Sequence, residues 1–272
     1  MDPAGFELLL FSTDRDYVRE AVAAGVDGIV IDWEAAGKRR RQAGADTEIN
    51  RDTVEDLRRV RSSVDARVLC RINPPGALTE REVEAAIGAG ADEVLVPMVR
   101  SPNELERVIE ATAGRCGVGT LIETIAAVEG ARELAMLPLS RVYVGLNDLA
   151  IERRTSRIFD AVADGTVERV SRAVDRPFGF AGLTAPERGA PIPCRLLIGE
   201  LVRLGSSFSF LRRTYKRDVR RGEQAASIAR LIEAIVAARG RAPFEVERDR
   251  SELEAAIAAW PRGDAGEVRA AT

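Results

Sequence analysis

The 272-residue sequence contains no histidine, and only two of its forty basic residues are lysines, Lys38 and Lys216. Without histidine the chain cannot form a Ser-His-Asp triad, a Cys-His pair, a histidine-bound zinc site or a histidine general base. The scarcity of lysine leaves a Schiff-base mechanism with two candidate nucleophiles. Any chemistry must therefore depend on carboxylates, arginines, hydroxyls, backbone groups or a metal ion.

Other scarce features narrow the class of protein. The three cysteines (Cys70, Cys116 and Cys194) lie far apart without metal-ligand spacing, which suits a reduced, cytoplasmic protein. No apolar run approaches about 18 residues, so we expect no transmembrane helix, and the amino terminus lacks the basic segment of a signal peptide. With 43 acidic against 40 basic residues, the chain is not a basic nucleic-acid binder. Neither a membrane nor a nucleic acid is expected as a partner.

What the sequence does contain is an alternation of short apolar runs with longer amphipathic stretches, the pattern of repeated βα units. Eight runs predict strands: Phe6–Thr13, Gly28–Glu34, Ala66–Asn73, Asp92–Val99, Gly117–Thr124, Arg141–Asp148, Phe178–Thr184 and Ser206–Arg213. Eight strand–helix units predict a (β/α)8 TIM barrel of the α/β class. A doubly wound open sheet is disfavoured because no GxGxxG motif follows the first strand.

Helices are predicted between several of these strands. They cover Asp14–Ala24, Thr53–Val64, Thr79–Ala89, Pro102–Ala113 and Pro193–Leu204. Two of the starts, at Thr79 and Ser101, have a glutamate three residues later, which is the spacing of a capping box.

The C-terminal part of the chain is longer than a barrel requires. Beyond Lys216 the pattern predicts one long helix to about Ala238, a proline-containing extended piece and a second helix over Ser251–Ala259. We expect a barrel domain over residues 1–240 and a C-terminal extension over residues 241–272. The extra helix either packs on a neighbouring subunit or closes the base of its own barrel.

Polar side chains follow the predicted strands at the end where barrel enzymes hold their active sites. They are Asp32 and Glu34 on the second strand, Arg71 and Asn73 on the third, Glu123 on the fifth, Asn147 and Asp148 on the sixth, Thr184 on the seventh and Arg212 on the eighth. Burying an unpaired charge is costly, so these charges should meet partners or a cation.

Two acids of this set, Glu123 and Asp148, come from adjacent strands and together could hold a divalent ion. Hard oxygen ligands without histidine favour Mg²⁺ or Mn²⁺ over zinc. Two alternatives stay open: a salt-bridge network with Arg71 that braces the end of the barrel, and helix N-capping by Asp148. For Arg71 itself, a bidentate clamp on a substrate carboxylate or enolate oxygen competes with an ion pair to Asp32 or Glu34.

A strongly basic loop follows the second strand. Within residues 35–42, Lys38, Arg41 and Gln42 could form an anion-binding lid for a carboxylate, a phosphate or CoA, although a solvated loop is the ordinary explanation of such a run. Thr184 and Arg212, at the ends of the last two strands, could add to substrate specificity.

Five of these segments resemble the HpcH/HpaI aldolase and citrate lyase β-subunit family, in order and spacing, along roughly residues 6–215. They are Asp27–Glu34, Arg71–Asn73, Gly90–Met98, Ile122–Thr124 and Gly145–Leu149. A narrower likeness, to uncharacterised members, is carried by Gly37–Gln42, Phe178–Gly182 and Arg203–Ser206.

The resemblance implies a barrel that is often oligomeric through its C-terminal helix, as a trimer or hexamer, and that cleaves or forms a carbon–carbon bond with Mg²⁺ or Mn²⁺. By this likeness Glu123 and Asp148 are metal ligands, and Arg71 holds the enolate oxygen and carboxylate of a pyruvate-like or acyl-CoA-derived fragment. The pyruvate aldolases of the family keep a histidine after the strand-two aspartate, where this chain has Ala35 or its neighbours. The narrower group has Glu-His where this chain has Glu200 and Leu201.

The sequence therefore predicts a metal-dependent carbon–carbon lyase or aldolase acting on a 2-oxo acid or an acyl-CoA-type substrate. A divalent ion on Glu123 and Asp148 would act as a Lewis acid toward a developing enolate, with Arg71 adding positive charge. Asp32 or Glu34, or water at the ion, would move the proton. Alternatives are a Schiff-base aldolase using Lys38 or Lys216, another enolate enzyme such as a decarboxylase or thioester hydrolase, and a non-catalytic binding barrel.

Overall fold

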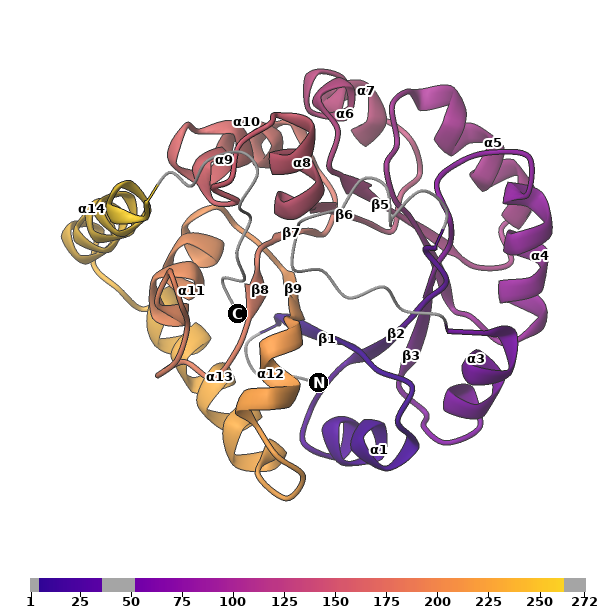
Figure 1. Cartoon of the computed structure of the whole chain (residues 1–272), viewed down its shortest axis with the longest axis horizontal. Helices are drawn as coiled ribbons and strands as arrows, with labels where there is room; N and C mark the ends of the chain where they lie inside the picture. Colours follow the sequence, from indigo (N-terminus) through magenta and orange to yellow (C-terminus); the bar gives the residue numbers. More distant parts are fainter. Residues whose placement is uncertain (1–4, 36–51, 262–272) are drawn as a thin grey trace.

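The computed structural model describes residues 5–35 and 52–261, and a parallel sheet forms its centre (Figure 1). The strands are β1 (Glu7–Phe11), β2 (Gly28–Asp32), β3 (Arg67–Arg71), β4 (Glu93–Val96), β5 (Gly117–Ile122), β6 (Arg141–Val144), β7 (Phe178–Phe180), β8 (Gly182–Leu183) and β9 (Phe208–Leu211). Their order in the sheet is β7-β6-β5-β4-β3-β2-β1-β9-β8, so neighbours along the chain are mostly neighbours in space. Every predicted strand is present, which confirms the α/β barrel prediction.

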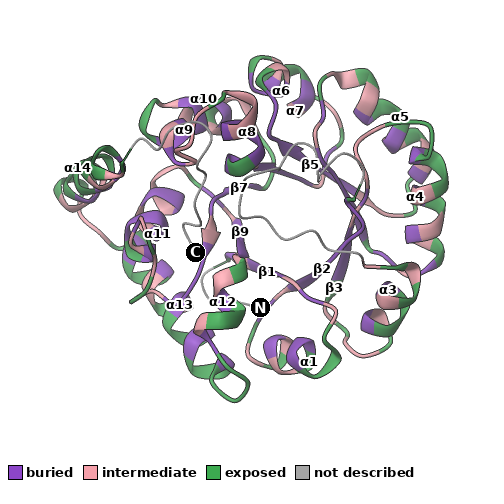
Figure 2. Ribbon diagram, viewed as in Figure 1, coloured by how far each residue is buried: buried purple, intermediate pink, exposed green. Residues whose placement is uncertain are grey.

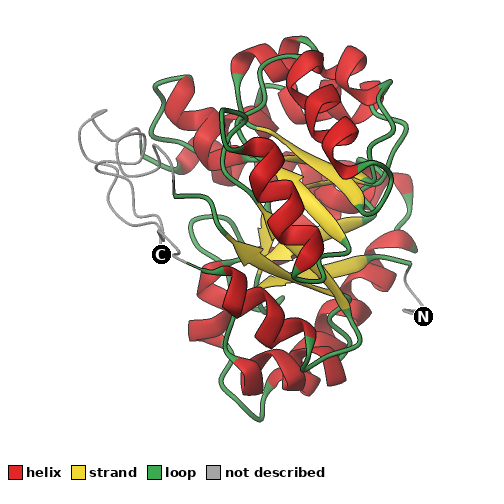
Figure 3. Ribbon diagram, turned by 90° about the vertical axis from the view of Figure 1, so that its right-hand side faces the viewer, coloured by secondary structure: helices red, strands yellow, loops and turns green. Residues whose placement is uncertain are grey.

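Helices surround the strands on the outside (Figure 3). They are α1 (Arg15–Ala23), α3 (Val54–Arg61), α4 (Thr79–Gly88), α5 (Pro102–Thr112), α6 (Ile125–Glu129), α7 (Ala131–Ala135), α8 (Leu146–Glu152), α9 (Asp160–Ala163), α10 (Thr166–Ala173), α11 (Cys194–Arg203), α12 (Arg213–Asp218), α13 (Gln224–Arg239) and α14 (Pro243–Ala259). Most helices bury one face toward the centre of the molecule and expose the other, as the burial colours of Figure 2 show.

The barrel is nearly closed by one stretch of chain that pairs on both sides. β7 pairs with β6, and β8, which follows directly, pairs with β9. Ala181 separates them in a left-handed conformation with φ of 51°, so the predicted strand over 178–184 is broken into two. The backbone N–H of Ser207 donates to the carbonyl of Phe178, and the Ser209 hydroxyl donates to the carbonyl of Ala181. These bonds join the two ends of the sheet.

The barrel interior is filled by three layers of inward-facing side chains. The middle layer is apolar and consists of Leu9, Val30, Leu69, Leu95, Leu121, Tyr143, Phe208 and Phe210. Below it lies a charged layer, which we call the floor, where Arg141 pairs with Glu93 and Glu7. Above it, at the carboxyl ends of the strands, lies the layer that we call the mouth. The fold therefore places one set of charges at each end of an apolar plug.

The C-terminal helices differ from the prediction. The long helix α13 begins at Gln224, after the separate short helix α12, and the proline that we expected in an extended piece is the first residue of a 17-residue helix, α14. Pro243 fits there because its missing N–H lies in the first turn, where no intrahelical bond is lost. α14 packs on α11 and α9 of its own chain. Contact with a neighbouring subunit stays a prediction.

One predicted helix cap is wrong and the other is right. Ser101 and Glu104 form the expected capping box of α5. Thr79 instead is the first residue of α4, and its hydroxyl accepts from the backbone N–H of Gly76. Glu82, the supposed partner, accepts from Asn73, so tertiary contacts replace the local cap.

Within residues 5–35 and 52–261, none of the helices combines the length and apolar character needed to cross a bilayer.

Candidate active site at the barrel mouth

Three charged residues of neighbouring strands meet at the mouth. The Arg71 Nε and Nη2 atoms donate to the two carboxylate oxygens of Asp32 at 2.8 and 2.7 Å, and Nη1 lies 3.4 Å from Glu34. Asp32 and Glu34 are fully buried. The ion pairs that competed with a substrate clamp are therefore present, and Arg71 arrives at the mouth already oriented by two carboxylates.

The guanidinium of Arg71 also stacks over an aromatic ring. Its central carbon lies 5.0 Å from the ring centroid of Phe11, the last residue of β1. Burial opposes the charge on Arg71, but the carboxylate of Asp32 outweighs burial and raises the pKa of Arg71. The positive charge is permanent and fixed in direction, as electrostatic stabilisation of an anion requires.

Glu123 lies at the end of β5, almost fully buried. Its Oε1 accepts the backbone N–H of Met98 at 2.8 Å, and Met98 takes a left-handed φ of 56°. Gly145 leaves the room that this carboxylate needs, because a Cβ there would lie 2.3 Å from Glu123 Oε2. Backbone geometry on two neighbouring loops therefore fixes where Glu123 points.

Asp148 lies beside Glu123, on the adjacent strand–helix unit. It is 8% exposed and belongs to the first turn of α8, whose N-cap is Gly145, so the N-capping alternative for Asp148 is wrong. Burial, and then the charges of Asp148 and Glu34, raise the pKa of Glu123 well above its ordinary value. The two buried acids repel each other, and a cation bound between them would relieve that repulsion.

The donor set suits a hard divalent cation with few protein ligands. In the described part of the chain, there is no group of three or more histidine, cysteine or acidic residues that could hold a metal ion. Mg²⁺ is commonly bound through one or two carboxylates, with water and substrate oxygens completing its octahedron. Glu123 and Asp148 supply that number of carboxylates, so the residues present fit such an ion.

The remaining predicted residues lie in different surroundings. Asn73 is engaged in structure: its Oδ1 accepts from Ala35 N, and its amide donates to Glu82. Thr184 is buried and donates to Asp218 at 2.9 Å, whereas Asn147 is exposed in the first turn of α8. Lys38, Arg41 and Gln42 lie outside the described residues. Arg212 is half-buried at the end of β9.

Sequence reasoning missed Asp52. Its Oδ2 accepts the backbone N–H of Asp32 at 2.9 Å, and burial, assisted by the charge of Asp32, raises its pKa. In sequence, Asp52 directly precedes Thr53, the N-cap of α3, and it looks like an ordinary polar residue at a helix start. Only the folded chain brings it to the mouth.

Three other candidate nucleophiles lie among the described residues, and none of the three fits this site. Burial raises the pKa of the Cys70 thiol well above its usual value and that of Cys194 to about 11, so neither is a ready thiolate. Lys216 is exposed on α12, whereas a Schiff-base lysine needs an environment that removes its proton.

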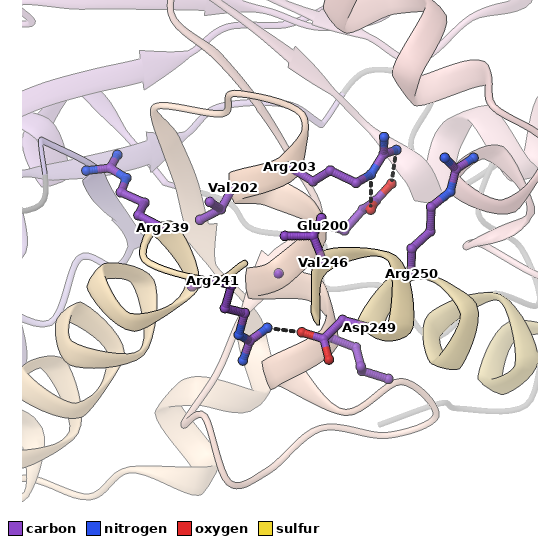
Figure 4. Close-up of a pocket in the computed structure, with 11 residues that line it drawn as sticks. Glu200, Val202, Arg203, Arg239, Arg241, Val246, Asp249 and Arg250 are labelled. Carbon is purple, nitrogen blue, oxygen red and sulfur yellow. Dashed lines mark hydrogen bonds and ion pairs between the residues drawn. The ribbon is translucent and has the colours of Figure 1, made fainter. Parts of the chain in front are cut away.

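A separate cavity of about 260 Å³ lies outside the barrel, between α11, α13 and α14 (Figure 4). Two ion pairs line it: Arg203 with Glu200 at 2.7 Å, and Arg241 with Asp249. Leu201, beside Glu200, is buried in the core outside the barrel. The Glu-Leu departure from the narrower group therefore concerns this outer layer and not the mouth.

The raised pKa of Glu123 predicts a pH effect on stability. In the folded, metal-free protein Glu123 keeps its proton above the ordinary pKa of 4.5, whereas the unfolded chain releases it. Stability should therefore fall as pH rises above that value, with a slope of up to about 1.4 kcal/mol per pH unit from this group.

Urea unfolding with EDTA at pH 5 to 8 measures this effect. Glu123→Gln removes the contribution, so the variant should gain stability relative to the parent as pH rises. Glu129→Gln, the same change on an exposed residue of α6, should follow the parent. Parallel curves for Glu123→Gln and the parent would contradict the prediction.

Comparisons with known proteins bear on the family and the fold. The model of the HpcH/HpaI aldolase/citrate lyase family matches residues 7–173. Comparison with curated protein sequences gives no match. The crystal structure of RipC from Yersinia pestis is similar with a TM-score of 0.57 at 14% identity, covering 90% of this chain and 100% of that one. The citrate synthase SbnG is similar with a TM-score of 0.57 at 18% identity, covering 86% and 93%. At these identities both likenesses concern the fold alone. Because the family model spans more than half of the sequence, the chain belongs to the HpcH/HpaI aldolase/citrate lyase family.

Proposed function

We propose that this protein is a divalent-metal-dependent carbon–carbon lyase or aldolase that acts through the enolate of a 2-oxo acid, pyruvate- or oxaloacetate-like, or of an acyl-CoA-type substrate. The observation that carries the proposal is the pair of buried acids Glu123 and Asp148 beside the half-buried cation Arg71. Membership of a family of aldolases and citrate lyases, which typically use divalent metals, supports it.

Glu123 and Asp148 would hold Mg²⁺ or Mn²⁺, which as a Lewis acid stabilises negative charge on a substrate carbonyl oxygen. The chain itself supplies the orientation of the Glu123 carboxylate, through the Met98 N–H and the space at Gly145. The apolar layer below the mouth, including Tyr143 and Phe210, excludes water from beneath the substrate and so strengthens each charge interaction.

Arg71 provides the second positive charge. Its Nε and Nη2 atoms are occupied by Asp32, and Nη1 lies at the longer distance of 3.4 Å from Glu34. We infer that Nη1 is the donor that turns to the substrate oxygen, while the bidentate pair with Asp32 keeps the guanidinium plane in place. Asp32 is then a positioning residue.

Of the two proposed bases, Asp32 is engaged through both of its oxygens in holding Arg71. Asp32 accepts two short bonds from Arg71, at 2.8 and 2.7 Å, and a third from the backbone N–H of Glu34. Glu34 has the looser contact with the same guanidinium, so we assign to it the movement of the substrate proton.

Exchange of substrate protons with deuterium tests the proposal without knowledge of the natural substrate. Pyruvate or acetyl-CoA in D₂O with Mn²⁺ or Mg²⁺ should lose its methyl proton signal in the NMR spectrum when the enzyme forms the enolate. Glu123→Gln should reduce this exchange at least about 10²-fold, because it removes one of two ligands to the ion. Glu129→Gln is the matched control.

The alternatives give different results. The Schiff-base mechanism would be established if exchange continued in EDTA and borohydride attached the substrate covalently to a lysine. That result would overturn the metal-dependent mechanism. Binding of pyruvate without exchange would support a non-catalytic barrel. Exchange that is unaffected in Glu123→Gln would remove this carboxylate from the reaction.

A further inference from the structure

Arg212 directly follows β9, which is separated from β6, the strand before Asp148, by the stretch of chain that forms β7 and β8. Along β9, Phe208 and Phe210 face the barrel interior, whereas Leu211 belongs to the outer core. The alternation of side chains along a strand places the next residue, Arg212, on the interior side, above Phe210. Gly182, which pairs with Phe210, confirms this position, because a Cβ at Gly182 would lie 2.7 Å from the Cβ of Arg212.

Among the described residues, the guanidinium of Arg212 has no ion-pair partner. In residues 5–35 and 52–261 no carboxylate lies within ion-pair distance of it, and its buried Nε has no hydrogen-bond partner. Burial lowers the pKa of Arg212. The pKa of Arg71, in contrast, is raised by its carboxylate partner Asp32. A half-buried, unpaired guanidinium costs free energy unless an anion satisfies it.

The neighbouring side chains limit what that anion is. Asp218 accepts a hydrogen bond from Thr184 next to Arg212, and Arg217 lies 3.8 Å from Asp218. The acid beside the guanidinium disfavours a doubly charged phosphate. A single carboxylate matches the planar donor fork of arginine and carries one charge.

We propose that Arg212 binds a second carboxylate of the substrate, at the end remote from the reacting carbonyl. This inference rests on the proposed function, because the carbonyl end is held by the Arg71 and Glu123 side of the mouth. The natural substrate is then a dicarboxylic 2-oxo compound or the aldol that contains one, and Arg212 determines specificity without taking part in bond cleavage.

Calorimetric titration in the presence of Mn²⁺ tests the inference with matched acids. The diacids are oxaloacetate, 2-oxoglutarate and 2-oxoadipate, and each is compared with the 2-oxo monoacid of equal chain length. The parent should bind at least one diacid roughly 10- to 100-fold more tightly than its monoacid, the value of a charge-assisted hydrogen bond. Arg212→Gln should abolish that preference and leave monoacid binding within about threefold.

Controls separate this inference from the proposed function. Arg217→Gln removes the same charge from an exposed neighbour and should keep the preference, and Arg212→Lys should keep part of it. Circular dichroism and urea unfolding confirm that each variant is folded. If monoacids bind but no diacid binds more tightly, or the preference survives in Arg212→Gln, this inference alone is wrong. If monoacids show no metal-dependent binding, the proposed function falls and this inference with it.

Discussion

Replacing Arg71 by lysine is expected to slow the metal-dependent exchange of pyruvate protons about 10²- to 10³-fold, the usual cost of removing one oriented charge from an anion site. Lysine keeps the charge but has neither the planar fork that holds both oxygens of Asp32 nor the flat face that stacks on Phe11. The ammonium can then satisfy Asp32 or the substrate, but not both. The loss should appear chiefly in kcat, because the charge matters most when the enolate forms.

Arg67→Lys provides the control for this prediction. Arg67 is on the same strand, four residues away at the floor, where it pairs with Glu7 at 3.1 Å. The same chemical change there should alter exchange by less than about threefold. A similarly small effect at Arg71 would show that this guanidinium braces the mouth and does not stabilise the enolate. The methionine variant is a poorer probe, because it would leave Asp32 and Glu34 buried with no cation beside them.

The fold could be predicted from sequence because each barrel unit carries its own local signal. Buried parallel strands are continuous apolar runs, and the helices between them repeat apolar residues every three or four positions. The places that failed are those where a tertiary contact outweighs the local preference. Glu82 holds Asn73 and does not cap its own helix, and Ala181 breaks a strand so that one stretch of chain serves both edges of the sheet.

The candidate site was predictable to the extent that strand ends fix it. Alternation along each strand and the common position of all strand ends bring Asp32, Arg71, Glu123 and Asp148 to one layer. Which of these residues pair could not be predicted, because that depends on side-chain reach across strands: Arg71 could equally have served the other acids. The role of Asp52 could not be predicted for the same reason, since its contact with Asp32 joins residues that are 20 positions apart in the sequence.

The mouth contains acidic groups that could hold a proton in a chain without histidine. A histidine base titrates near neutral pH, whereas burial and mutual repulsion raise the pKa of acids in a buried cluster. Burial and the neighbouring acids raise the pKa of Glu123 at this mouth, and Asp52 shows the same direction. The barrel can therefore place proton-holding groups beside Arg71 without imidazole.

The second large effect is expected at the floor of the barrel, in Arg141→Met. Arg141 is 2% exposed, with its Nε 2.8 Å from Glu93 and Nη1 2.8 Å from Glu7, and it lies over the ring of Phe208 at 4.8 Å. Methionine fills part of the space but leaves Glu93, itself 3% exposed, as a buried charge without its cation. The free energy of unfolding, measured with urea at pH 7, should fall by about 3–5 kcal/mol.

A double variant separates the unpaired charge from the lost packing. In Arg141→Met combined with Glu93→Leu, no uncompensated acid remains at the centre of the floor, and replacing a whole buried ion pair by apolar residues is often close to neutral. Most of the lost stability should return, and in both variants the activity per folded molecule should match the parent, since the apolar layer separates the floor from the mouth. A double variant no more stable than Arg141→Met would instead attribute the loss to packing around Phe208. If the stability returns, the two charged layers differ in kind: the mouth keeps its acids for a ligand, whereas the floor keeps Glu93 because Arg141 needs it.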